Sequence, residues 1–214
     1  MPSFLCIFAG YMVEMKSILP GDAPFVRLNP PIEGQVLLHC CCAPCSSAIL
    51  ECLKLNEIPV TVFFSNSNIF PLAEYDIRRN ELIRYCQMLD VEYVEDIYAH
   101  DDWLKQVAEG NESAPERGPR CLACFKYRLS RAAKYAAANG YSLLTTTLAS
   151  SRWKSLEQIN AAGTEAVSGL KHGSGLLWWD MNWRKGGLQP RRCELIKELG
   201  FYNQLYCGCE FSSK

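Results

Sequence analysis

Cysteine spacing constrains this chain more than any other feature of its sequence. Eight of the twelve cysteines fall into three short segments, and the other four stand alone. The three segments are Cys40-Cys41-Cys42-Ala43-Pro44-Cys45, Cys121-Leu122-Ala123-Cys124 and Cys207-Gly208-Cys209. Thiols at this spacing bind a metal centre or form redox-active pairs. Since the segments come from the beginning, middle and end of the chain, the whole fold would be needed to bring them into one site.

Length and charge exclude several classes of protein. A secreted disulfide framework belongs to chains much shorter than the 214 residues found here. No segment approaches the roughly 18 consecutive apolar residues that span a bilayer. The first fifteen residues contain Glu14 and no basic residue, unlike a signal peptide. We therefore expect a cytoplasmic protein with reduced thiols and no membrane partner. The net charge of −1 means that any surface for nucleic acid must be a local patch.

Apolar segments of strand length alternate with segments of helical period along most of the chain. The predicted strands cover residues 35–39, 59–64, 91–94, 143–147 and 176–179. The predicted helices cover residues 44–53, 73–89, 102–109, 121 to just before 140, 154–162 and 191–199. This alternation predicts an α/β fold, with a mostly parallel sheet covered on both faces, in one domain over residues 35–214. Residues 1–34, rich in proline and glycine, are expected to form an irregular N-terminal extension.

Polar residues follow several of the predicted strands. His39 ends the first strand, Asn66 and Asn68 follow the second, and Thr147 ends the fourth. In parallel α/β sheets the functional site lies beyond the carboxyl ends of the strands. We therefore expect these side chains to converge there with the cysteines.

The cysteine pairs admit different chemistries. Cys121 and Cys124, at a helix N-terminus, would be favoured as thiolates and suit either a metal cluster or zinc. A disulfide across Gly208 would close a small strained ring that is easily reduced, although Cys207 and Cys209 could also be zinc ligands. A dithiol carries two electrons and an iron–sulfur cluster carries one, so the combination suggests a reductase.

Five segments of the chain together match a known family. They are Leu37 to Ser46, Phe64 to Ile69 with Glu74, Tyr75 and Arg78, Arg120 to Cys124 with Arg128 and Leu129, Thr145 to Leu148 with Lys154, and Tyr202 to Ser212. These segments resemble the QueH-type epoxyqueuosine reductases from about residue 35 to the C-terminus. The resemblance implies a Rossmann-like three-layer sandwich related to adenine-nucleotide hydrolases. It also implies reduction of epoxyqueuosine to queuosine at the wobble position of tRNA, the last step of queuosine biosynthesis.

The resemblance also implies roles for six cysteines. A [4Fe-4S] cluster would be held by Cys41, Cys42, Cys121 and Cys124. The redox-active pair would be Cys207 and Cys209. Removing the epoxide oxygen consumes two electrons and two protons and releases water, so the reaction needs an electron donor, which the sequence does not identify. It also needs an acid or a Lewis-acid metal at the leaving oxygen.

Some residues stand outside these assignments. Cys40 makes a triple cysteine where the family usually has a double one, and residues 64–68 differ from the family's usual loop. Cys45 has no role in the cluster or the redox pair, and with an aspartate it could hold a further metal ion near the cluster. Asp96, after the third strand, is one candidate acid or ligand. The segment 1–34 lies outside the resemblance.

Basic residues lie near the second cysteine motif and after the fourth strand. The predicted contacts to the tRNA are Asn66, Asn68, Arg128 and Lys154. Tryptophans between basic residues, such as Trp153, suit stacking on splayed bases. Two other classes stay open: a zinc-stabilised RNA-binding module, and a thiol-disulfide oxidoreductase acting through Cys42 and Cys45. A sulfur transferase is disfavoured, since cysteines replace its Ser-Gly-Gly-x-Asp loop after the first strand.

Overall fold

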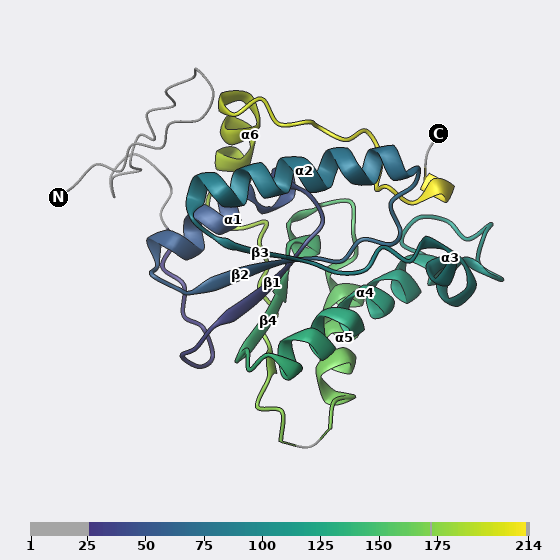
Figure 1. The fold of residues 1–214 in the computed structure, drawn as a ribbon, viewed down its shortest axis with the longest axis horizontal. Coiled ribbons are helices and arrows are strands. Elements are labelled where there is room, and N and C mark those ends of the chain that lie inside the picture. Colours follow the sequence, from purple (N-terminus) through teal and green to yellow (C-terminus); the bar gives the residue numbers. More distant parts are fainter. Residues whose placement is uncertain (1–25, 172, 213–214) are drawn as a thin grey trace.

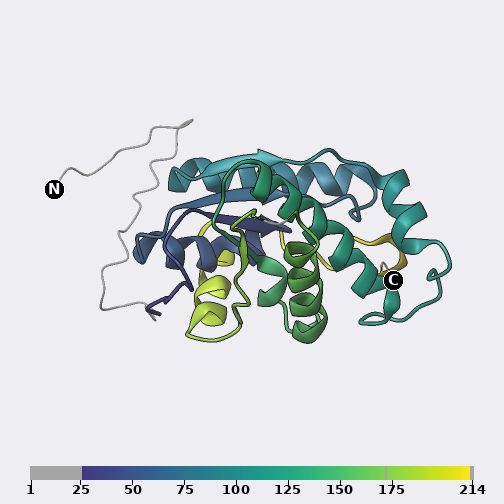
Figure 2. The ribbon, with the colours of Figure 1, turned by 90° about the horizontal axis from the view of Figure 1, so that it is seen from below.

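A parallel sheet between two layers of helices forms the body of the molecule (Figures 1 and 2). The computed structural model describes residues 26–171 and 173–212. The strands are β1 Val36–Cys40, β2 Val60–Phe64, β3 Glu92–Glu95, β4 Leu143–Thr146 and β5 Leu177–Trp178. They lie in the order β3-β2-β1-β4-β5, and all neighbours are parallel. The Rossmann-like α/β prediction is therefore confirmed.

Helices bury both faces of this sheet. They are α1 Ala43–Leu55, α2 Leu72–Leu89, α3 His100–Trp103, α4 Pro119–Ala138, α5 Leu156–Ser168 and α6 Leu188–Glu198. On one face α1 packs against α2 and α6, and on the other α4 packs along α5. Leu38 of β1 lies in the core with α1 and α2, while its neighbour Leu37 lies in the core beside α4. A strand buried on both faces needs apolar residues in succession, which explains the apolar run in β1.

The winding of the chain creates a crevice beside β1. From β1 the chain winds through β2 to β3, and it then crosses back to place β4 on the other side of β1. The loops that follow β1 and β4 therefore lead away in opposite directions. In open α/β sheets the crevice that they leave is where ligands bind. The first cysteine segment follows β1 at this point.

Three helix boundaries differ from the prediction for identifiable reasons. The segment 102–109 is a short α3 followed by a π-helical turn, Leu104–Ala108, and both contribute to one small core. Helix α5 continues through Gly163 to Ser168; a Cβ at Gly163 would lie 2.2 Å from the Trp178 ring, so the glycine lets the helix pack closely against this ring. Helix α6 begins before Pro190, since the first turn of a helix tolerates a residue without an N–H.

Most of the predicted N-terminal extension lies outside the described residues. The described part, residues 26–34, contains no helix or strand. It is tied to the body where the Leu28 amide donates to Asn56 Oδ1 at 2.8 Å, and the Leu28 side chain is buried. Among the described residues, no helix is long and apolar enough to cross a bilayer.

Candidate metal and redox site

Three thiols lie together where β1 passes into α1. The Sγ atoms of Cys41, Cys42 and Cys45 all lie within 4.8 Å of one another, and those of Cys41 and Cys42 are 3.8 Å apart. Cys42 is the N-cap residue of α1, and Pro44 in the first turn favours the helix start. The turn from strand into helix therefore points adjacent cysteines at a common space.

Protons are shared unequally among these thiols. The pKa of Cys41 is lowered, because Cys42 and Cys45 can both donate hydrogen bonds to its thiolate, and this outweighs its burial. The pKa of Cys42 is correspondingly raised. Thr147 supports the same thiolate, since its hydroxyl donates to Cys41 Sγ at 3.5 Å. Thr147 therefore lies beside the cysteines, as the sequence predicted.

Cys40 does not belong to this group. It is the last residue of β1, its side chain is completely buried in the core, and burial raises the pKa of its thiol. The adjacent pair that can act together is therefore Cys41 and Cys42.

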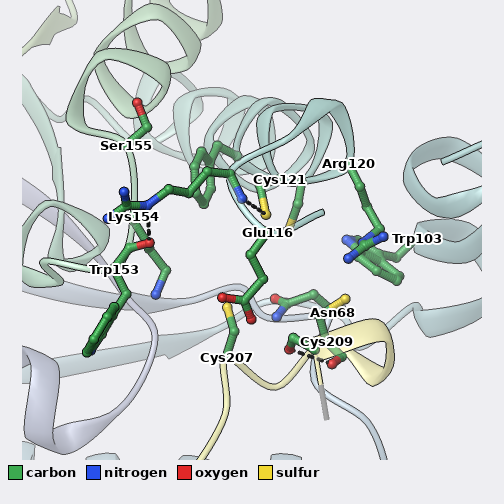
Figure 3. A pocket seen from close by; sticks show the side chains of 14 residues that line it. Asn68, Trp103, Glu116, Arg120, Cys121, Trp153, Lys154, Ser155, Cys207 and Cys209 are labelled. Carbon is green, nitrogen blue, oxygen red and sulfur yellow. Dashed lines mark hydrogen bonds between the residues drawn. The ribbon is translucent and has the colours of Figure 1, made fainter. Parts of the chain in front are cut away.

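The other four clustered cysteines line an open cavity of about 590 Å³ (Figure 3). Cys121 and Cys124 come from the first turns of α4, and the backbone N–H of Arg117 donates to Cys121 Sγ at 3.3 Å. Cys207 is exposed, Cys209 is buried, and both thiols are free. Burial raises the pKa of Cys121 and of Cys124, so the expected effect of the helix N-terminus does not dominate there. Metal binding at these thiols would release protons.

Two cations act on both groups of thiols. Lys154 lines the cavity; burial alone would lower its pKa, but negative charge at Cys207, Cys41 and Cys45 raises it. The charge of Arg128 favours the thiolates of both Cys41 and Cys124. The compact thiol group holds Cys41, Cys42 and Cys45 but not Cys121 or Cys124, which line the cavity, and the charges of Lys154 and Arg128 act on both sets of thiols.

Two of the predicted tRNA contacts are buried in the walls of the site. The Arg128 side chain is 1% exposed, and its guanidinium donates to Ser65 O and Asn66 Oδ1. Asn66 Nδ2 in turn donates to Cys40 O at 2.9 Å. In this structure Arg128 and Asn66 join α4 to the ends of β1 and β2, and their direct contact with RNA stays a prediction.

Asn68 and Lys154 both line the cavity, although the Asn68 residue is only 1% exposed. Asn68 Oδ1 has no hydrogen-bond partner among the described residues. An unpartnered buried amide oxygen is costly unless a ligand supplies a donor.

His39 does not reach into the cavity. It is completely buried, and its ring nitrogens contact Thr146 Oγ1 at 2.7 Å and Ser65 O at 3.1 Å. Burial and the charge of Arg128 lower the pKa of His39 to about 3. A neutral imidazole in this position ties β1 to its neighbours and does not supply protons.

Asp96 forms an ion pair with Arg131 and a hydrogen bond with Ser65. Its carboxylate accepts from Arg131 Nη2 at 2.7 Å and from the Ser65 hydroxyl at 2.6 Å. Burial would raise the pKa of Asp96, but these bonds outweigh it and lower the pKa. The candidate acid or ligand proposed from sequence is therefore an ion-pair partner in this structure.

Arg78 is a site residue that local sequence patterns do not reveal. Its side chain is 2% exposed, and its guanidinium donates to Tyr206 O at 3.2 Å and to Cys207 O at 3.1 Å. Glu74 accepts from Arg78 Nε at 2.7 Å. The spacing of Glu74 and Arg78 suggests only a helical ion pair. The role of Arg78 in holding the Cys207 loop depends on contacts between residues that are far apart in the sequence.

Replacing Gly208 by alanine should displace this loop. Gly208 has φ +104°, and a Cβ there would lie 2.9 Å from both Arg78 Nη1 and Ile69 Cγ1. We expect turnover to fall by about a hundredfold, since small displacements of reacting groups have effects of that order. Gly200→Ala is the matched control, because Gly200 also has a positive φ but nothing within 4 Å of the added Cβ. Equal turnover in the two variants, measured alongside thermal unfolding, would contradict the positioning role.

Comparison with known proteins identifies the family. Residues 36–214 match the family model described as epoxyqueuosine reductase QueH. The chain is 41% identical over 200 residues to the epoxyqueuosine reductase QueH of Histophilus somni, covering 92% of this chain and 81% of that protein. It is 42% identical over 190 residues to the protein of the same name from Acinetobacter baylyi, covering 88% and 85%. The corresponding protein of Thermotoga maritima is 34% identical over 184 residues, covering 84% and 90%.

The family model includes all the clustered cysteines, and it covers the whole described sheet. The resemblance inferred from the sequence is thereby confirmed over the part of the chain in which it was found. The chain belongs to the family of QueH epoxyqueuosine reductases.

Proposed function

We propose that this protein reduces epoxyqueuosine within tRNA to queuosine, with electrons delivered through a [4Fe-4S] cluster and a cysteine pair. The observation that carries the proposal is a compact group of three thiols after β1, together with an open cavity lined by the other two thiol segments, in a member of this family. A cytoplasmic location, where thiols stay reduced, fits this function. The immediate electron donor is a separate partner that must deliver two electrons per turnover.

Cys41, Cys42, Cys121 and Cys124 would hold the cluster. The donor set fits, because Fe–S clusters are held by cysteine thiolates and the pKa of Cys41 is already lowered. A group of four irons spans more space than a single ion, which suits thiols contributed from the turn between β1 and α1 and from α4. When bound, the cluster supplies electrons one at a time.

Cys45 lies close enough to Cys41 and Cys42 to share a metal with them. It is the residue around which a further metal ion could bind. In the part of the chain that the structure describes, no carboxylate joins this group of three thiols. A further ion would therefore depend on thiolate ligands, and soft thiolates select metals such as iron or zinc.

The chain's own residues define how the substrate is handled. Cys207 and Cys209 can supply two electrons as they form a disulfide, while the epoxide oxygen leaves as water after taking up two protons. The Lys154 ammonium lines the same cavity and can donate a hydrogen bond to that oxygen. Asn68 can accept from the modified base through its unpartnered Oδ1.

Trp153 provides a surface for a neighbouring base. Its side chain is 68% exposed, it lines the cavity, and the Arg152 guanidinium lies 4.9 Å from the ring centroid. Single-stranded loops of RNA are recognised by stacking of splayed bases on such rings. This supports binding of the anticodon loop at the cavity mouth.

The alternative of a thiol-disulfide oxidoreductase acting on proteins has little support. Cys42 is 1% exposed and Cys45 is 5% exposed, so a protein disulfide could not reach them without rearrangement. A zinc-stabilised RNA-binding module has a suitable donor set. It differs from the reductase in predicting tightly bound zinc and no redox chemistry.

The decisive assay uses protein purified without oxygen and tRNA that carries epoxyqueuosine. After addition of a chemical reductant, the tRNA is digested and its nucleosides are separated by chromatography and mass spectrometry. We expect queuosine to appear in step with loss of epoxyqueuosine. Protein that binds its cluster and accepts electrons but forms no queuosine would refute the proposed reaction.

A further inference from the structure

A second hollow adjoins the active-site cavity. It is an open space of about 1070 Å³ beside the first turns of α5. Arg117, Lys154 and Ser155 line both spaces. The segment of residues 152–155 therefore forms a ridge between them. No cysteine lines this hollow, so it is not part of the thiol centre.

Positive charge dominates the lining of the second hollow. Its charged residues are three cations, Arg117, Lys154 and Arg184, and one carboxylate, Glu157. Within the described chain, none of these cations forms a salt bridge. Burial together with the charge of Arg117 lowers the pKa of Arg184. Two guanidiniums that line one hollow, with no salt bridge to either among the described residues, favour an anion.

Both guanidiniums are fixed in place by the ridge. Arg117 donates to Trp153 O at 2.9 Å and to Arg152 O at 2.7 Å, while Arg184 Nη2 donates to Lys154 O at 2.8 Å. A guanidinium has five N–H donors, so each retains others. Arg184 Nε is buried and has no partner among the described residues. Prearranged donors of this kind bind an anion at little cost in side-chain entropy.

We propose that this hollow binds a backbone phosphate of the tRNA, next to the nucleotide whose base enters the active-site cavity. The proposal rests on the proposed function and adds where the RNA backbone is held. A nucleotide carries its phosphates one sugar ring from its base. A base in the cavity would therefore bring a phosphate across the ridge of residues 152–155, beneath the base stacked on Trp153. Phosphate contacts position RNA without reading its sequence.

The test compares Arg184→Gln with wild type in tRNA binding, measured by fluorescence anisotropy from 50 to 200 mM KCl. Arg184 lines the second hollow and not the cavity. We expect the dissociation constant at low salt to rise about tenfold, as for a lost charge-assisted hydrogen bond. The slope of log Kd against log salt should flatten by about one contact. Arg117→Gln should flatten it similarly.

Two further variants separate phosphate binding from a structural role. Arg184→Lys keeps the positive charge but loses the guanidinium, which donates to Lys154 O in the ridge. If the role of Arg184 is to bind phosphate, this variant should keep the wild-type salt slope. If the side chain only supports the ridge, Arg184→Lys should instead show the same weaker tRNA binding and the same flatter salt slope as Arg184→Gln. Arg27→Gln is the matched control, because Arg27 is an exposed cation that does not line the second hollow. Its neighbour Leu28 donates a hydrogen bond to Asn56, the C-cap residue of α1, at the opposite edge of the sheet.

The outcomes distinguish this proposal from the one on which it rests. An unchanged salt slope in both glutamine variants, with normal wild-type binding, overturns the phosphate site and leaves the reductase intact. Equal weakening by Arg27→Gln would show a general charge effect and would also overturn the site. If folded wild-type protein bound neither modified nor unmodified tRNA, the proposed function itself would fall. Inorganic phosphate that weakens tRNA binding of wild type by about the same tenfold factor at constant ionic strength, but does not weaken that of Arg184→Gln, would support the assignment.

Discussion

Replacing Cys121 by serine should remove the metal centre and all reductase activity. Anaerobically purified wild type is expected to be brown and to contain about four irons and four sulfides per chain. The variant should be colourless with little iron, because a hydroxyl cannot replace the thiolate on the α4 side of the site. Cys121 is only half-buried, so the fold should tolerate the change better than at buried Cys124. Iron content, sulfide content and visible absorption measure the result.

Cys193→Ser is the control for this experiment. Cys193 lies exposed on α6, outside the clustered segments, and its loss should leave iron and activity unchanged. Active wild type with stoichiometric zinc and no iron would contradict the cluster, although the family assignment would stand. Retention of four irons in both Cys121→Ser and Cys124→Ser would show that other thiols are the ligands.

Replacing Cys209 by serine should stop turnover while leaving the iron content intact. The reason is that the two-electron step would need both thiols of the Cys207-Gly208-Cys209 segment, whereas the cluster would need neither. The measurement is queuosine formation alongside iron analysis and the visible spectrum of the same preparation. Loss of iron in this variant would instead make the pair ligands.

Cys86→Ala is a suitable control for Cys209→Ser, because Cys86 is a buried thiol on α2 outside the site. Its loss should cost some stability, on the order of 1 kcal/mol for a small buried side chain, without changing turnover. Equal loss of turnover in the two variants would indicate general destabilisation in place of a redox role.

The strands and most helices were predictable because the interactions that select them are local. A strand buried on both faces has an apolar run, as in β1, and a helix has a 3.6-residue period and a recognisable start, such as Pro44. The errors arose where tertiary contacts override local preference. At Gly163 the absence of a side chain lets helix α5 pack against the Trp178 ring, a tertiary contact that offsets the weak helix preference of glycine.

The positions of the cations predicted to contact tRNA were less predictable than those of the cysteines. Arg128 and Lys154 are both cations beside the site, and nothing local distinguishes them. The fold buries Arg128 against Ser65 and Asn66 and leaves Lys154 facing the cavity. A long cationic side chain can support a wall or meet a ligand, and only its neighbours decide which.

By itself, the sequence determined the parallel α/β architecture, the family and the set of thiols proposed to hold a cluster, because these depend on periodicity and on residue types at fixed spacing. The tertiary structure decided which thiols meet. It joined Cys41, Cys42 and Cys45 into one group, placed Cys40 in the core, and used Arg78 to hold the Cys207 loop. It also formed the basic hollow from Arg117 and Arg184, which lie far apart along the chain. Contacts between such distant residues arise from the packing of the whole sheet and its helices, and no local pattern specifies them.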